Sequence, residues 1–187
     1  PFRIYCSRLE AAASERLEHL QSDTPAADRI ALIEFFEATK GEKWHNNDNW
    51  LSDKPLGEWH GIRQAARGGA TRVVQIVLPE NNLCGPLPAS LPYINRLEHL
   101  DLSKNCRYNK HTGARIRDTG VCGPLPERLG NLKNLTTALL SCNSVSGSIP
   151  ASIRTMSELV TLDLDDNQLS GALPLALTGW IRQQIND

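Results

Sequence analysis

The sequence predicts an α/β solenoid: a right-handed superhelix of stacked coils, with a parallel β-sheet on its concave face and a helical N-terminal cap. Three observations predict it, namely an asparagine, a glycine and a proline that each recur at fixed spacing. The asparagines are Asn81, Asn105, Asn143 and Asn167, spaced 24, 38 and 24 residues apart. The period is therefore 24 residues, with one insertion of 14. A fixed period of this length is typical of solenoids, whose coils bury their apolar faces only by stacking.

Each repeat is expected to form a short inner strand, a turn and a return along the outer face. The apolar residues of two coils show the shared spacing: Leu97, Leu100 and Leu102, then Leu159, Leu162 and Leu164. The asparagine follows the strand, where the chain turns inward, and its amide can satisfy backbone groups that would otherwise be buried and unpaired. We therefore expect the four asparagines to form a buried, hydrogen-bonded ladder.

These repeats resemble a known family. The pattern N-x-L-S-G-x-(I/L)-P is that of plant-type leucine-rich repeats, as in receptor-kinase ectodomains and polygalacturonase-inhibiting proteins, and it runs from Arg72 to about Trp180. The resemblance implies a second short sheet at the L-S-G-x-I-P segment. Asp28–Ile62 is similar to the N-terminal cap of such proteins. It lacks the cysteine pair of land-plant caps and is closer to algal and microbial versions.

The chain is expected to be one domain in four parts. They are an N-terminal helical arm (1–25), a cap (26–72), four repeats (73–96, 97–134, 135–158 and 159–182) and a C-terminal tail (183–187). The second repeat holds the insertion, 106–120. Arg67–Ala70 reads as a loop, and 175–185 as a closing helix. Trp44, Trp50 and Trp59 fall in the cap, where we expect them to seal the open end of the first coil.

Composition narrows the functional classes. The chain has 20 basic and 21 acidic residues, which argues against a general nucleic-acid binder. No apolar run approaches the roughly 20 residues that cross a bilayer, and no secretory signal is visible. The sequence assigns no compartment. The alternatives are an organelle lumen or, after removal of a leader, a secretory or extracellular location.

The five cysteines are an odd number, so at least one is unpaired unless it bonds to another chain. Three interpretations remain open. Cys84 and Cys122 hold the same phase in adjacent coils, which stack about 4.8 Å apart, within the reach of a disulfide. Cys106 and Cys122 could instead close the insertion. The third interpretation is buried free thiols in sites that suit a serine.

Motifs for catalysis and for metal binding are missing from the sequence. It contains no nucleophile elbow, phosphate loop or H-E-x-x-H run, and its histidines lack zinc-like spacing with cysteines. Asp163, Asp165 and Asp166 are an ordinary variant of the repeat pattern L-D-L-S-N-N rather than a Ca²⁺ loop. We expect no enzymatic activity, no cofactor and no metal.

The phase of the repeats predicts the partner-binding face, because strand positions that alternate with the buried leucines point to the concave side. They are Gln75, Val77, His99, Asp101, Thr137, Leu139, Thr161 and Asp163, flanked by Lys104 and Asp165. Four strands present only about 300–400 Å², whereas a standard interface takes about 800 Å² per partner. We therefore expect the insertion to contribute through its cations, Arg107, Lys110, Arg115 and Arg117. These suit an acidic partner surface, or the chain's own aspartates two coils away.

The sequence thus favours a non-catalytic protein–protein interaction module, serving as an accessory or scaffold subunit of a larger assembly. The resemblance implies an alternative: an extracellular receptor-like domain that recognises a peptide or glycan, or an enzyme inhibitor of the polygalacturonase-inhibiting type. A second alternative is an accessory module of an enzyme whose catalytic part lies elsewhere.

Overall fold

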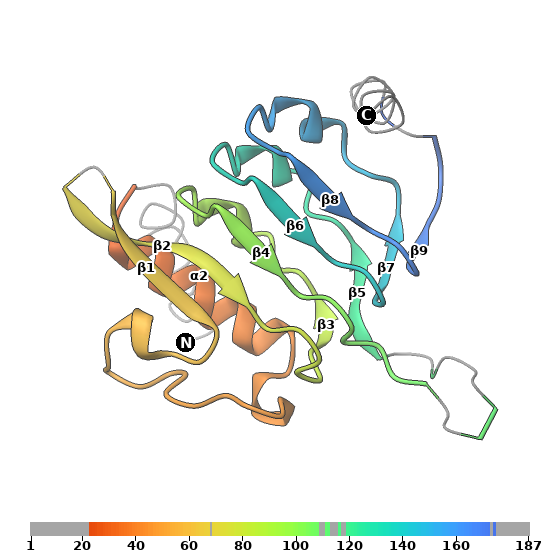
Figure 1. Cartoon of the computed structure of the whole chain (residues 1–187), viewed down its shortest axis with the longest axis horizontal. Coiled ribbons are helices and arrows are strands. Elements are labelled where there is room, and N and C mark those ends of the chain that lie inside the picture. The colour runs from red at the N-terminus through yellow and green to blue at the C-terminus, as the bar shows by residue number, and fades with distance from the viewer. Residues whose placement is uncertain are drawn as a thin grey trace, which may run out of the picture.

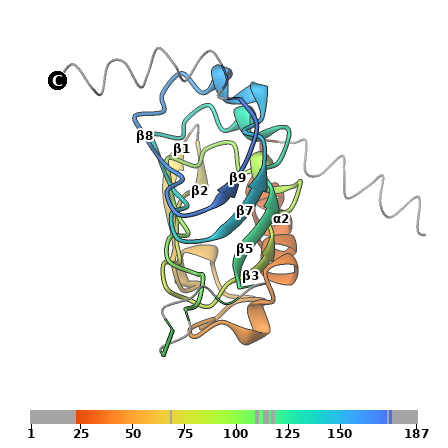
Figure 2. The ribbon, with the colours of Figure 1, turned by 90° about the vertical axis from the view of Figure 1, so that its right-hand side faces the viewer.

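The computed structural model describes residues 23–67, 69–108, 111–112, 116, 119–172 and 174. Within them the chain forms two sheets on opposite sides of a stack of coils, with one α-helix packed at the first coil (Figures 1 and 2). One sheet has five strands in the order β1-β2-β4-β6-β8, and the other has four in the order β3-β5-β7-β9. The expected arm (apart from 23–25), the closing helix at 175–185 and the tail lie outside the described residues.

The elements alternate along the chain. The strands are β1 (Ile62–Arg67), β2 (Ala70–Val77), β3 (Cys84–Pro86), β4 (His99–Asp101), β5 (Gly120–Pro124), β6 (Thr137–Leu139), β7 (Ser144–Gly147), β8 (Thr161–Asp163) and β9 (Gln168–Leu169). The helices are α2 (Pro25–Ala38) and the short 3-10 helices η1 (Gly41–Lys43), η2 (Leu56–Glu58), η3 (Leu91–Tyr93), η4 (Leu129–Asn131) and η5 (Ala151–Thr155).

The α/β solenoid predicted from the period is confirmed. Strands β2, β4, β6 and β8 pair in parallel, and so do the four strands of the second sheet, which the resemblance implied. The structure adds one strand: β1 pairs antiparallel with β2. The segment predicted as a loop before the first repeat is the turn of this hairpin, where Gly69 takes a φ of 83°.

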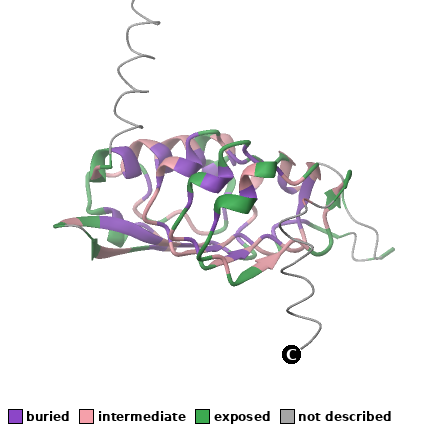
Figure 3. Cartoon of the chain, turned by 90° about the horizontal axis from the view of Figure 1, so that it is seen from above, coloured by how far each residue is buried: buried purple, intermediate pink, exposed green. Residues whose placement is uncertain are grey.

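The apolar side chains of successive coils stack into one core. Ile76, Leu100 and Ala138 occupy equivalent strand positions and are almost fully buried. Leu162 and Leu164 of the last coil are only half-buried. Figure 3 shows buried residues concentrated in the cap and the first coils. The coil stack is therefore least covered at β8, among the residues the structure describes.

Asn143 shows how the coils are joined. It is fully buried, and its Nδ2 donates to the carbonyl of Leu102 in the preceding coil (2.7 Å) and of Leu140 in its own coil (3.0 Å). Its Oδ1 accepts the N–H of Val121, also in the preceding coil (2.8 Å). One side chain thus satisfies both a buried acceptor and a buried donor of the neighbouring coil.

The other ladder asparagines repeat this arrangement. Asn105 donates to Leu78 O (3.0 Å) and accepts from the N–H of Asn81 (2.9 Å). Asn167, which is half-buried, bonds the third coil in the same way. Asn81 continues the ladder into the cap, where its side chain exchanges two hydrogen bonds with the backbone of Asn46.

The cap helix begins and ends at specific contacts. Thr24 is its N-cap and accepts a hydrogen bond from Ala27 N–H (3.3 Å), with Pro25 at the first turn. At its other end the helix meets the first coil so closely that a Cβ on Gly85 would collide with the carbonyl of Ala38. Cys84 N–H donates to Thr39 O (3.0 Å) at the same point.

The cap tryptophans pack against one another and against α2. The ring centroids of Trp44 and Trp50 are 4.8 Å apart, and those of Trp50 and Trp59 are 5.1 Å apart. Phe36 stacks on Trp50 at 5.6 Å, and the guanidinium of Arg29 lies 5.0 Å above the Trp59 ring. All three tryptophans are at least 93% buried, which places a dense aromatic cluster under the first coil.

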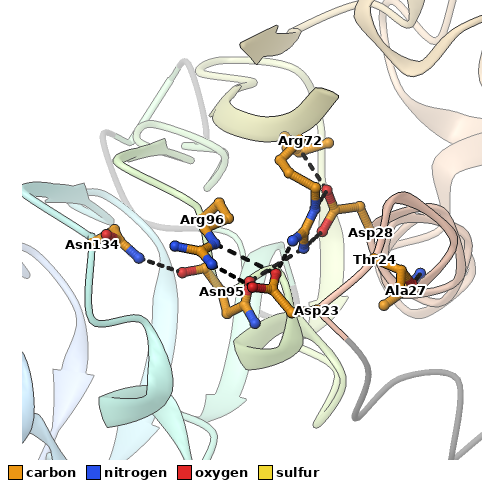
Figure 4. Close-up of polar contacts among 9 residues, drawn as sticks. Asp23, Thr24, Ala27, Asp28, Arg72, Asn95, Arg96 and Asn134 are labelled. Carbon is orange, nitrogen blue, oxygen red and sulfur yellow. Dashed lines mark hydrogen bonds and ion pairs between the residues drawn. The ribbon is translucent and has the colours of Figure 1, made fainter. Parts of the chain in front are cut away.

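A buried ion pair fastens this cap to the first repeat (Figure 4). Arg72 Nε and Nη2 donate to the two carboxylate oxygens of Asp28, at 2.9 and 2.8 Å, and the Val73 N–H donates to the same carboxylate. Asp23, which is partly exposed, contacts both Arg72 and Arg96. Burial raises the pKa of the Asp28 carboxyl, against the opposing Val73 hydrogen bond, and burial also lowers the pKa of Arg72.

Replacing Asn143 by Ala should lower the free energy of unfolding by roughly 1–3 kcal/mol, since buried backbone groups of two coils lose their partner. Chemical denaturation followed by circular dichroism measures the change. Asn131→Ala, at an exposed position in η4, is the matched control and should stay within about 0.5 kcal/mol of the wild type. Equal midpoints for both variants would contradict a structural role for the ladder.

Replacing Arg72 by Ala should cost about 3–5 kcal/mol, because it leaves the Asp28 carboxylate buried without its counter-ion. The double variant Arg72→Met, Asp28→Leu should recover much of that loss, since it removes both charges. Arg67→Ala breaks the exposed pair with Glu98 and an exposed hydrogen bond to the Ala66 carbonyl, and it should cost less than about 1 kcal/mol. A loss for Arg72→Ala no larger than this control would show that the pair does not fasten the cap.

Candidate functional site

The five-stranded sheet carries two rows of side chains in register on its outer face. The first row is Arg63, Gln75, His99, Thr137 and Thr161, and the second is Val77, Asp101, Leu139 and Asp163. Their strand neighbours point the other way, into the core. The structure thus places all eight predicted strand positions on one face, and adds the exposed Arg63 from β1.

Two aspartates of the second row also support the chain's own turns. Asp101 Oδ1 accepts from the N–H (3.0 Å) and the hydroxyl (2.7 Å) of Ser103. Asp163 Oδ1 accepts from the N–H of Asp165 (3.0 Å). Such side-chain turns fix the backbone where each strand ends. These two carboxylates are therefore held in place by the chain's own turns.

A third row lies at the corner where each coil turns inward. Glu80, Lys104, Cys142 and Asp166 precede the ladder asparagines, with φ of 52°, 58°, 54° and 50°. Non-glycine residues rarely adopt this left-handed region. The Lys104 ammonium lies 3.3 Å from the Glu80 carboxylate, an exposed pair of small energetic value. We call these four residues the corner row.

The insertion leaves the solenoid beside the corner row. A hollow of about 420 Å³ opens there, lined by His45, Glu80, Asn82, Lys104, Asn105, Cys106, Arg107, Tyr108 and Cys142. Two hydrogen bonds join the outgoing and returning segments at the base of the insertion. The Arg107 N–H donates to Thr119 Oγ1 (2.9 Å), and the Ile116 N–H donates to Arg107 O (2.7 Å). The Tyr108 hydroxyl reaches across to the fourth coil and donates to the carboxylate of Asp166.

The insertion adjoins only part of the predicted partner-binding set. Lys104 and Arg107 line the hollow, but His99 and Asp101 do not, because they lie within β4, before the chain turns inward. The insertion starts after that turn, so it meets the corner row rather than the strands. Lys110, Arg115 and Arg117 lie outside the described residues.

The sequence analysis did not single out Tyr108 and Ile116. They are exposed apolar side chains, at 43% and 41%, on the two sides of the insertion's base. In the sequence, the one feature that could have indicated Tyr108 is that it is the only aromatic residue in the basic segment C-R-Y-N-K-H (106–111). The pKa of the Tyr108 hydroxyl is raised, first by its hydrogen bond to Asp166 and then by one to Cys106.

Of the three interpretations of the cysteines, the structure agrees with free thiols, and the possible disulfide between Cys84 and Cys122 is not formed. Cys84, Cys106, Cys122 and Cys142 are all thiols, and Cys6 lies outside the described residues. In the β3–β5 pairing Cys84 lies opposite Gly120, and Cys122 lies opposite Pro86. The two repeats therefore pair with an offset of two residues in the second sheet, although their sequences align without one.

The described residues contain no group of three or more histidine, cysteine or acidic side chains arranged to hold a metal ion. No helix in the described part of the chain has the length and apolar character needed to cross a membrane.

The known proteins that resemble this chain include leucine-rich repeat proteins of plants. Residues 158–180 match the family model described as Leucine Rich Repeat. The ectodomain of the receptor kinase SOBIR1 from Arabidopsis thaliana is 25% identical, with a TM-score of 0.60 over 81% of this chain and 72% of that one. The BIR3–SERK2 complex from the same plant matches at 26% identity and a TM-score of 0.55, over 76% of this chain and 72% of that one.

Two other structures share the fold at lower identity. PEPR1, solved with AtPEP1, is 23% identical with a TM-score of 0.62 over 81% of this chain, and a plant ice-binding protein is 24% identical with a TM-score of 0.64 over 84%. This chain spans only 19% of the former and 46% of the latter. The asparagine ladder, the paired sheets and these matches show a leucine-rich repeat fold of the plant type, similar to that of receptor-kinase ectodomains.

Proposed function

We propose that the chain is a non-catalytic module that binds a protein partner across its concave sheet and the base of its insertion. The observation that carries the proposal is the pair of in-register rows on the sheet, flanked by the exposed apolar side chains of Tyr108 and Ile116. Solenoids use such extended concave faces for recognition, and insertions in their repeats often lie at binding faces.

The insertion supplies what the sheet lacks in area. The strand face of about 300–400 Å² falls short of the roughly 800 Å² that each partner buries in a standard interface. Tyr108 and Ile116 extend this face beyond the corner row with large apolar side chains. Aromatic residues are enriched among the few contacts that dominate binding energy. A partner that touches both surfaces would therefore bury enough area for a stable complex.

The charges suggest the partner's character. Arg63 and Arg107 are exposed at two edges of this surface. With Lys110, Arg115 and Arg117 they suit an acidic protein surface, which would speed association at low salt. In this role the chain serves as an accessory or scaffold subunit of a larger assembly.

A receptor-like role for an extended ligand is the second candidate. Its support is the likeness to the SOBIR1 ectodomain over 81% of this chain. The two candidates differ in what they bind: an isolated short peptide would suffice for the receptor-like role, whereas the subunit role requires a folded partner. Protease treatment of a captured partner separates them, because only a ligand of the first kind survives as a fragment that still binds.

Adding an arginine at the face should abolish partner capture. Thr161→Arg places a long cation within the first row, where it would block contact with β6 and β8. The measurement is the set of proteins retained from native extract by the immobilised chain, quantified by mass spectrometry. Ser148→Arg, exposed after β7 on the second sheet, is the matched control and should retain the partner.

The base of the insertion is tested with Tyr108→Ala and Ile116→Ala, which should each weaken the same partner by about ten-fold or more, as hot-spot residues do. Leu51→Ala removes an equally exposed apolar residue from the cap and should leave binding unchanged. A partner retained equally by the Thr161, Tyr108 and Ile116 variants would place the interface elsewhere on the chain.

The contact between Tyr108 and Asp166 predicts a titration. The carboxylate stabilises the protonated hydroxyl, so the Tyr108 pKa lies above its usual value of about 10. Asp166→Asn should lower that pKa toward the usual value, as followed by the ultraviolet absorbance of the phenolate. Subtracting the profile of Tyr108→Phe isolates this residue from the other two tyrosines. Identical profiles with and without Asp166 would show that the contact is absent in solution.

A further inference from the structure

Two cysteines of neighbouring coils lie together at the base of the insertion. Cys106 follows a ladder asparagine in the second coil, and Cys142 precedes one in the third. The N–H of Cys106 donates to the carbonyl of Cys142 at 3.0 Å, and both residues line the hollow beside Tyr108. Cys106 is 9% exposed, and Cys142 is half-buried.

We propose that Cys106 and Cys142 are a redox-active pair, which a low-molecular-weight disulfide oxidises to a crosslink between the second and third coils. The pairing goes beyond the partner-binding role and does not depend on it. It is also distinct from the Cys84–Cys122 and Cys106–Cys122 disulfides that the sequence suggests.

The backbone brings the two residues within range. Adjacent parallel coils stack about 4.8 Å apart, so residues joined by a backbone hydrogen bond between them have Cα atoms roughly 5–6 Å apart. A disulfide requires a Cα separation of about 4.4–6.8 Å. The side chains share neighbours as well: the Tyr108 hydroxyl bonds both Cys106 and the Asp166 carboxylate, and Asp166 in turn bonds the Cys142 thiol. Both sulfur atoms therefore belong to one small polar cluster.

The reaction balances as an ordinary thiol–disulfide exchange. The Cys142 thiolate, the more exposed of the two, attacks one sulfur of the small disulfide and releases one thiol. The Cys106 thiolate then attacks the Cys142 sulfur of the mixed disulfide and releases the second thiol. The protein loses two hydrogens and the oxidant is reduced to two thiols. Burial raises the pKa of Cys142, so the first step is slow at neutral pH.

The crosslink has a structural consequence. The Tyr108 hydroxyl is held by hydrogen bonds to the Asp166 carboxylate and to the Cys106 thiol. Forming the disulfide consumes that thiol and so removes the second of these contacts. It also closes the chain between the second and third coils, insertion included, into a loop that restrains the unfolded state. Oxidation should therefore stabilise the solenoid and change how Tyr108 positions the base of the insertion.

The test is to treat the full chain with oxidised glutathione under native conditions and to map its peptides by mass spectrometry. The expected result is a linked pair of peptides containing Cys106 and Cys142, with a mass lower by two hydrogens. Tm should rise by roughly 5–10 °C and return on reduction with dithiothreitol.

Two serine variants provide the controls. Cys84→Ser should still form the link, whereas Cys142→Ser should neither form it nor gain stability on oxidation. Linkage of Cys106 to Cys122 would overturn the proposal. So would glutathione adducts on Cys106 and Cys142 without a linked pair, or two thiols that stay reduced in the wild type. Peptide mapping of the wild type decides the question even if a variant fails to fold.

Discussion

The structure depends on how each coil turns inward without leaving buried backbone groups unpaired. At every turn an asparagine side chain provides the missing donor and acceptor, and it does so for the preceding coil as well as its own. This arrangement explains why the chain tolerates the insertion. The insertion leaves after Asn105 and returns before Val121, whose N–H bonds Asn143. Because an asparagine of the ladder forms hydrogen bonds at each end of the insertion, the core beneath the insertion is continuous.

The cap solves a related problem at the first coil, which has no preceding coil to bond. Asn81 finds its partner in the backbone of Asn46, and the Asp28 carboxylate accepts the N–H of Val73 at the start of the first repeat. The carboxylate is itself neutralised by Arg72, so a buried charge pair takes the place of a coil-to-coil contact. This attachment positions β2, and through β2 it sets the register of both rows on the concave face.

The sequence predicted most of what recurs with the period and missed what does not. The ladder positions, the buried leucines and the two rows follow from a spacing of 24, because equivalent residues must stack. The hairpin that adds Arg63 has no counterpart in the other coils, and its glycine turn resembles a loop. One periodic feature was also missed: each strand pair of the second sheet is offset by two residues from the aligned repeats, which the alignment alone does not reveal. The contact between Tyr108 and Asp166 joins residues 58 positions apart.

The insertion, the hollow and the contact between Tyr108 and Asp166 lie together at one corner of the coil stack. The corner row requires a left-handed backbone from residues that are not glycine, and the insertion, the hollow and two thiols all adjoin it. The left-handed corner residue recurs in all four coils, whereas the insertion leaves only the second, so a coil that only stacks does not need the insertion. Departures from the locally best sequence are expected where a protein binds or reacts. In the binding role that we propose, the regular coils are therefore the rigid support, and Tyr108, which crosses from the second coil to the fourth, would determine specificity.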